Sequence, residues 1–171
     1  MKMRSIEEFP VLITDLMQSP EGPTDSLRIC LVSVGGEFFA LDIRQVQEVF
    51  ELESVTPVPG MPAALLGVAN LRGTIIPLVD LSAVLSRSRV TNPKYVVVVR
   101  HGSQQIGIAI DEVPETRSIS LDDHLAPSAH PSSLSSPVLF SFLNIGNQLC
   151  GVVEVSRLVA LLDGAMESTR V

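Results

Sequence analysis

The chain contains no tryptophan, only 4% aromatic residues and just two cysteines among its 171 residues. A core of this composition must be built from valine, isoleucine, leucine and alanine, and the length suits one compact domain or two closely packed halves. Two cysteines in apolar strand patterns do not make a disulfide framework. We therefore expect Cys30 and Cys150 to be buried, reduced thiols rather than a bonded pair.

Positive charge is also scarce, and the formal net charge is −7. This balance argues against nucleic-acid binding, which needs a basic face to displace counterions. No apolar run approaches the roughly 20 residues of a membrane-spanning helix. Glu7, Glu8 and Pro10 interrupt the start of the chain, where a signal peptide would need an apolar stretch. We expect a cytoplasmic protein with no direct membrane insertion.

The groups that catalysis needs do not converge in this sequence. It contains no nucleophile elbow, no phosphate-binding loop and no dinucleotide fingerprint. His101, His124 and His130 form no H-x-x-x-H pair, and neither cysteine has a partner at metal-ligand spacing. We expect no enzymatic activity, no metal and no cofactor.

Short strands with frequent turns dominate from Leu27 onward, as in a small barrel or sandwich. Leu27–Val34 and Glu37–Asp42 flank Gly35-Gly36, a hairpin dipeptide. Helical spacing predicts a short helix from Ile43 to Phe50, with Val46 on one side and Glu48 turned away. A second short helix is expected over Met61–Leu66.

The second half repeats this plan in outline. Tyr95–Arg100 and Gln104–Asp111 flank Gly102, and a final hairpin is expected over Val138–Ile145 and Gln148–Val155. Ser156 can cap a closing helix that runs to Leu162 and ends at Gly164. Asp42 and Asp111 occupy similar places after their hairpins, and Asp80 and Glu154 form a second pair at a slightly larger separation. The repeat suggests two similar half-barrels with a crossover near residues 86–93.

Three segments fall outside the repeat. Residues 1–26 are expected to form a helix and linker, with a helix start at Ser5 or Pro10, which either docks on its own barrel or contacts a partner. Asp122–Pro137 is predicted to be an exposed, mobile loop. Residues 163–171 are expected to form a C-terminal tail.

The most informative stretch is Gly67–Leu81, where two apolar strands flank the turn Asn70-Leu71-Arg72-Gly73. Gly73 permits the positive φ that a sharp turn often needs, and the β-branched residues after it favour a strand. Pro77 cannot donate to a ladder, so its strand should lie at an edge or carry a bulge. An arginine held at a rigid turn suits recognition better than chemistry, because it does not lose its proton.

This stretch resembles the CheW family of chemotaxis coupling proteins, whose NLRG motif stands here as Asn70-Leu71-Arg72-Gly73, followed by Ile76 to Leu81. Phe38–Ile43, Val46–Val49 and Gly107–Val113 also match family segments, in the family's order and spacing. The resemblance covers about residues 27–162. It implies a mainly β fold of two small five-stranded SH3-like barrels packed around a shared apolar seam, with short helices.

The resemblance also implies a function. Family members are non-enzymatic adaptors that couple chemoreceptors (methyl-accepting chemotaxis proteins) to the regulatory domain of a CheA-type histidine kinase, at membrane receptor arrays. Receptor contact is implied for four positions: Val46, Glu48, Gly67 and Arg72. The remaining motif positions have structural roles: Asn70, Leu71, Gly73, Pro77 and Asp80.

Several alternatives stay open at this point. Arg72 either contacts the receptor or supports the turn by bonding to backbone carbonyls or to Glu48. Gly67 is better explained as a backbone requirement than as a contact. The protein could also be a regulator that binds only the receptor or only the kinase, or a variant serving pili or surface motility. A small-molecule-binding or enzymatic double barrel would require a buried polar pocket.

Overall fold

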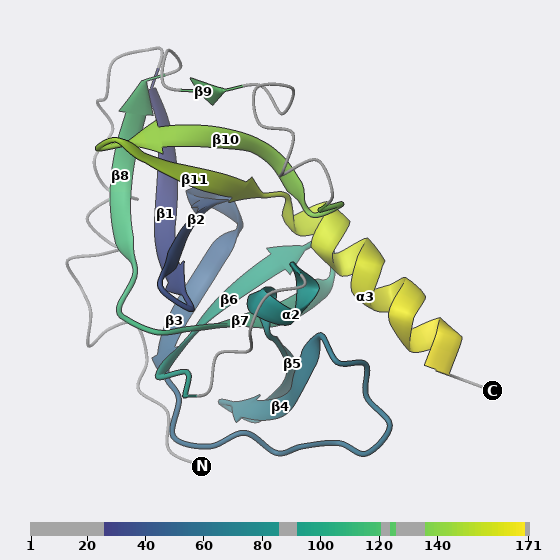
Figure 1. The fold of residues 1–171 in the computed structure, drawn as a ribbon. Helices are drawn as coiled ribbons and strands as arrows, with labels where there is room; N and C mark the ends of the chain where they lie inside the picture. Colours follow the sequence, from purple (N-terminus) through teal and green to yellow (C-terminus); the bar gives the residue numbers. More distant parts are fainter. Residues whose placement is uncertain (1–25, 86–91, 121–123, 126–135, 170–171) are drawn as a thin grey trace.

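The computed structural model describes residues 26–85, 92–120, 124–125 and 136–169 and shows a mainly β protein with short helices (Figure 1). The elements of the first half are β1 (Ser26–Val34), β2 (Glu37–Asp42), the 3-10 helix η2 (Ile43–Gln45), β3 (Val46–Glu51), β4 (Leu65–Leu71), β5 (Thr74–Val79) and α2 (Leu81–Val84). Those of the second half are β6 (Tyr95–His101), β7 (Gln104–Ile110), β8 (Glu115–Ser120), β9 (His124–Leu125), β10 (Leu139–Ile145), β11 (Gln148–Val153) and α3 (Val155–Thr169). The expected N-terminal helix, and most of the expected crossover and serine- and proline-rich loop, lie outside the described residues.

The strands form two small barrels, as the sequence predicts. Barrel A has the strand order β8-β1-β2-β11-β10, extended by the short strand β9, and barrel B has the order β3-β6-β7-β5-β4. Each barrel takes strands from both halves of the chain, because the β1–β2 hairpin lies in barrel A and the β6–β7 hairpin lies in barrel B. The two sequence repeats therefore exchange their first hairpins, and neither repeat forms a barrel by itself (Figure 1).

The repeat is visible in the backbone hydrogen bonds. The amide of Asp80 donates to the carbonyl of Ala64 at 2.8 Å, and that of Glu154 donates to the carbonyl of Val138 at 2.9 Å. One constant offset in sequence number relates both members of the first pair to those of the second, since 154 − 80 equals 138 − 64. Each barrel also contains one parallel pair, β5 with β7 and β11 with β2. The two barrels thus have the same internal plan.

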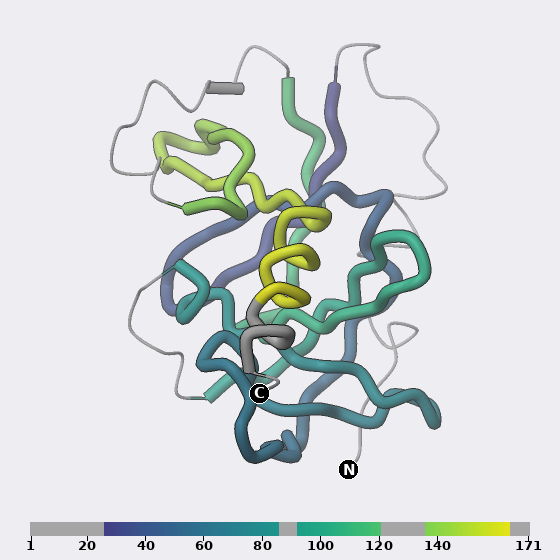
Figure 2. Tube along the Cα trace, turned by 90° about the vertical axis from the view of Figure 1, so that its right-hand side faces the viewer, coloured from purple at the N-terminus to yellow at the C-terminus, as the bar shows by residue number. Residues whose placement is uncertain are grey.

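The largest buried cluster spans both barrels and confirms the shared apolar seam. It joins Cys30 and Leu41 of barrel A to Val49 and Val97 of barrel B. Helix α3 follows the last strand of barrel A and runs across towards barrel B (Figure 2). Over residues 155–164 its buried face consists of four aliphatic residues, namely Val155, Leu158, Val159 and Leu162. Burial of this face holds the helix against both barrels.

The expected helix over Ile43–Phe50 is wrong. Only a 3-10 turn forms at Ile43–Gln45, and Val46–Glu51 is strand β3. The register of β3 against β6 shifts between Val46 and Glu48, which marks a β-bulge. A bulge adds one residue to the alternation, so buried Val46 and Val49 lie three positions apart, as they would on a helix. The helix expected over Met61–Leu66 is absent as well, since β4 begins at Leu65.

Two further expectations about chain breakers are corrected. Pro77 lies on β5, an inner strand of barrel B, and the nearby register shift is on β4 between Leu65 and Gly67. The proline is tolerated because pairing of β5 with β7 begins only at Leu78. Gly164 does not end α3, which continues to Thr169, so most of the expected tail is helical. Glycine inside a helix costs only about 1 kcal/mol relative to alanine, and packing of the preceding turns offsets this.

The two cysteines are free and buried, as expected. Burial raises the pKa of the Cys30 thiol from 9.0 to about 12, and it also raises the pKa of Cys150, against a smaller opposing effect of Arg117. Each thiol is therefore neutral in the folded protein at neutral pH.

This pKa shift predicts that stability falls as the pH rises from 9 towards 12. Below pH 9 the Cys30 thiol is protonated in both states, whereas above it only the unfolded chain releases the proton. We expect the free energy of unfolding to drop by about 1.4 kcal/mol at pH 10 from this group alone. Urea unfolding at pH 8 and pH 10 measures the drop. The Cys30→Ala variant should show a smaller one, and an equal drop would refute the assignment.

A candidate protein-binding site at the tip of barrel B

The motif turn joins β4 to β5 as a tight hairpin. Arg72 has φ 52° and Gly73 has φ 84°, so both lie in the left-handed region that such hairpin turns require. The side-chain oxygen of Asn70 accepts a hydrogen bond from the amide of Gly73 at 2.9 Å. The expected positive φ at Gly73 is confirmed. The hydrogen bond from the Gly73 amide to the Asn70 side chain stabilises the turn.

The turn places the Arg72 guanidinium across the end of barrel B. Its Nη1 donates to Oε1 of Glu48 on β3 at 3.0 Å, and its Cζ lies 5.6 Å from the ring centroid of Phe50. Because β3 and β4 are the two outer strands in the order of barrel B, this ion pair links the barrel's first and last strands. The alternative in which Arg72 bonds to Glu48 is therefore present in the structure.

The same ion pair remains open to a partner. The Arg72 side chain is 54% exposed and that of Glu48 is 33% exposed. An exposed pair of this kind contributes about 0–1 kcal/mol to stability, so the fold does not depend on it. Ile75, on the strand that follows the turn, is 67% exposed. This end of barrel B thus presents a partly exposed charge pair and, on the strand that follows the turn, an exposed aliphatic side chain.

Val46 and Gly67 are buried and do not belong to this exposed surface. Val46 is 2% exposed and belongs to the shared core. Gly67 has φ 148°, and a Cβ atom there would stand 2.3 Å from the carbonyl oxygen of Thr56. Thr56 and Val68 exchange two backbone hydrogen bonds, at 3.0 and 2.9 Å, which attach the segment after β3 to β4. Gly67 therefore meets a backbone requirement, as the sequence suggested.

The remaining motif residues stabilise the hairpin and its exit. Leu71 is 4% exposed and packs in the interior of barrel B. Asp80 is 1% exposed and is the N-cap of α2, where its Oδ1 accepts from the amides of Ser82 at 3.0 Å and Ala83 at 3.4 Å. Such a cap satisfies amides that the helix leaves without partners.

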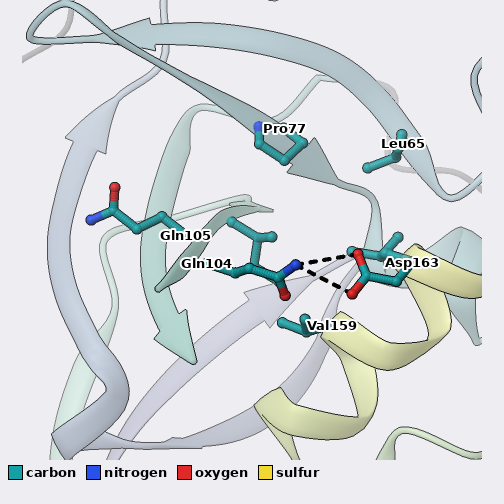
Figure 3. Close-up of a pocket in the computed structure, with 8 residues that line it drawn as sticks. Leu65, Pro77, Gln104, Gln105, Val159 and Asp163 are labelled. Carbon is teal, nitrogen blue, oxygen red and sulfur yellow. Dashed lines mark hydrogen bonds between the residues drawn. The ribbon is translucent and has the colours of Figure 1, made fainter. Parts of the chain in front are cut away.

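A separate cavity of about 170 Å³ lies under α3 (Figure 3). Leu65, Pro77 and Val159 are among its lining residues, and Gln104 donates to the carboxylate of Asp163 at its rim, at 3.3 Å. The lining is mainly aliphatic. Within the described ranges, no three His, Cys, Asp or Glu side chains gather as a metal would require. No helix of the described residues is long and apolar enough to cross a membrane.

Two barrels around one core, with an exposed ion pair at a rigid turn, define a double-barrel β-module with a surface suited to recognition. The chain matches the CheW-like domain family over residues 28–163 and belongs to that family.

Individual relatives agree with this assignment. The chain is 26% identical to the chemotaxis protein CheW of Klebsiella aerogenes over 154 residues, which cover 86% of this chain and 93% of that protein. It is 35% identical to the protein PilI of Pseudomonas aeruginosa over 82 residues, or 47% of this chain and 46% of PilI. The crystal structure of the scaffolding protein TtCheW from Thermoanaerobacter tengcongensis matches with a TM-score of 0.66 at 24% identity, covering 75% of this chain and 88% of that one. This last likeness concerns the fold.

Proposed function

We propose that the protein is a non-enzymatic cytoplasmic adaptor that couples chemoreceptors to a CheA-type histidine kinase at receptor arrays. The observation that carries the proposal is the exposed Arg72–Glu48 pair on a rigid turn, in a chain of the CheW-like family. A relative named chemotaxis protein supports the coupling role. We retain residues 27–162 as the unit that carries it.

The proposed receptor ligand is the helical hairpin at the cytoplasmic tip of the receptor. Helix-in-groove recognition needs apolar area for affinity and fixed charges for register. Ile75 supplies exposed apolar area at the tip of barrel B, and Arg72 and Glu48 supply a positive and a negative group. Val46 and Gly67 act on this contact only through the fold that supports it, since both are buried.

Capture of binding partners tests the coupling role. The tagged protein is used to retain proteins from a lysate of its own cells, and mass spectrometry identifies them. Recovery of both a methyl-accepting receptor and a histidine kinase supports the proposal. Recovery of one alone favours a regulator that competes for that partner, and recovery of a pilus-associated kinase would assign the pathway suggested by the PilI relative. Recovery of neither by a folded bait refutes the proposal.

Arg72→Ala should weaken receptor binding while leaving the protein folded. Loss of a charged contact at the centre of an interface typically costs more than about 1 kcal/mol, so we expect a roughly tenfold higher Kd for a receptor cytoplasmic fragment. Titration calorimetry measures the Kd, and circular dichroism measures the melting temperature.

Arg44→Ala is the matched control for this variant. Arg44 forms an exposed ion pair with Asp42 at 2.7 Å, with its side chain 81% exposed, and lies outside the motif turn. The control should bind the receptor fragment like the wild type. If Arg72→Ala melts much earlier than Arg44→Ala and loses kinase binding too, Arg72 supports the fold and is not a receptor contact.

A further inference from the structure

The repeat relates the ends of the two barrels residue by residue. The β10–β11 turn, Gly146-Asn147, has φ angles of 53° and 64°, close to the 52° and 84° of Arg72-Gly73. The register shift on β10, between Leu139 and Ser141, repeats the shift on β4, between Leu65 and Gly67. The offset that relates Glu154 to Asp80 relates all of these positions, so Gly146 is the counterpart of Arg72.

The strands β3 of barrel B and β8 of barrel A also correspond to each other, residue by residue. In barrel B, Glu48 and Phe50 of β3 stand opposite Val98 and Val96 of β6. In barrel A, Glu115 and Arg117 of β8 stand opposite Leu31 and Ile29 of β1. The separation in sequence number is the same for all four positions, since 115 − 48, 117 − 50, 98 − 31 and 96 − 29 are equal, and the hairpin exchange makes it run forward from β3 to β8 and backward from β6 to β1. Glu115 therefore takes the place of Glu48, and Arg117 takes the place of Phe50.

The end of barrel B is filled by its own side chains. The Phe50 ring is buried among residues that include Leu71, Ile76 and Val98. The Arg72 guanidinium covers the ring at 5.6 Å and is held by Glu48. A ring, a guanidinium over it and a carboxylate beside the guanidinium make one three-part arrangement.

Barrel A has two of these three parts. The Arg117 guanidinium lies 3.0 Å from the Glu115 carboxylate, and its side chain is 47% exposed instead of buried. The turn supplies no side chain at the position of Arg72, because Gly146 stands there. A hollow of about 190 Å³ remains, and its lining includes Leu31, Ile145 and Cys150. These three are the counterparts of the residues that surround the Phe50 ring in barrel B. Arg117, which takes the place of Phe50, is half-exposed and supplies no ring, so barrel A has no aromatic side chain at this position.

We propose that this hollow binds the aromatic side chain of a protein partner, which occupies the volume that Phe50 fills in barrel B. A cavity of about 150 Å³ accepts a benzene molecule, so the volume suffices for a ring. The Arg117 guanidinium complements the negative face of that ring, and Glu115 keeps it in place. Phe38, which is 37% exposed, adds aromatic surface at the hollow. This site is separate from the proposed receptor contact on barrel B and does not depend on it.

The probe is the peptide acetyl-Gly-Phe-Gly-amide, titrated to about 10 mM into the ¹⁵N-labelled protein, with acetyl-Gly-Ala-Gly-amide as the control. We expect saturable shifts of amide signals in β1, β8 and the β10–β11 turn with the phenylalanine peptide alone. Shifts that are absent, or equal for both peptides, would overturn the proposal.

Two variants test the location of binding. Arg117→Phe restores the ring inside the hollow, and Gly146→Arg places a side chain at its mouth, where a Cβ atom meets nothing within 4 Å. Each should weaken peptide binding at least tenfold. Gly102→Arg, at a hairpin turn with φ 62° and equally open space, is the matched control and should bind like the wild type. If one blocking variant does not fold, the other decides, and unchanged binding by a folded blocking variant refutes the assignment.

Discussion

Gly67→Ala is expected to leave little folded protein. The added methyl group would lie 2.3 Å from the Thr56 carbonyl oxygen and 2.8 Å from its carbonyl carbon, and a backbone group has no rotamer in which to move away. Relief requires separating Thr56 from Val68, whose two hydrogen bonds tie the segment after β3 to β4. A φ of 148° is also strained for alanine. We therefore expect the free energy of unfolding to fall by more than about 4 kcal/mol. Soluble yield and thermal unfolding by circular dichroism measure it.

Gly73→Ala is the matched control for this prediction. Gly73 has a positive φ of 84° in the same hairpin, but a Cβ atom there meets nothing within 4 Å. The control should lose only about 1–2 kcal/mol, the cost of a left-handed conformation for alanine. Comparable melting temperatures for the two variants would show that the backbone approach at Thr56 does not limit the fold.

Val46→Asp should unfold the protein and thereby abolish every binding activity together. Val46 is 2% exposed in the core shared by both barrels, so the carboxylate would be buried without a partner. An uncompensated buried charge costs about 3–5 kcal/mol, which is a large part of the stability of a domain. Urea unfolding measures the loss, and titration calorimetry measures receptor and kinase binding.

Val58→Asp makes the same chemical change at a valine that is 40% exposed, and it should be nearly neutral. The resemblance implied a receptor contact at Val46, whereas its burial indicates a core role, and the two roles predict different results for Val46→Asp. A Val46→Asp variant that stays folded and loses only receptor affinity would restore the contact assignment. Unfolding, with both affinities lost, supports the core role.

Local sequence signals predicted the hairpins because glycine marks their turns. The glycines before Glu37 and after His101, and the Gly146-Asn147 pair, each lie between strands that formed as expected. Strand β8 was missed because Ile119 is its only buried residue among polar side chains, so it shows no apolar alternation. The β-bulge in β3 produced a helix-like spacing for a related reason, namely that one-dimensional periodicity does not register an inserted residue.

The candidate site was only partly predictable. The sequence left the Arg72–Glu48 contact as one of two alternatives. The stretch of chain between the two residues does not reveal that β3 and the β4–β5 turn meet. The exposure of Ile75 was hidden by the run of apolar residues around it. Val46 is buried because it lies on strand β3, and the helix-like spacing of the apolar residues had hidden this strand. Long-range pairing, and not local propensity, decides these features.

The exchange of hairpins between the two barrels has a consequence for the growing polypeptide. When the ribosome has made the first repeat, β1 and β2 have no partner strands of their own barrel, and β3–β5 still lack β6 and β7. Barrel B becomes complete only after Ile110 has emerged, and barrel A only after Val153. The outer edges of the first hairpin therefore stay unpaired during most of synthesis. Unpaired strand edges can pair with the wrong strands. For the same reason, recombination can pass this module on only as a whole, since a cut between the repeats leaves two pieces that each lack part of both barrels.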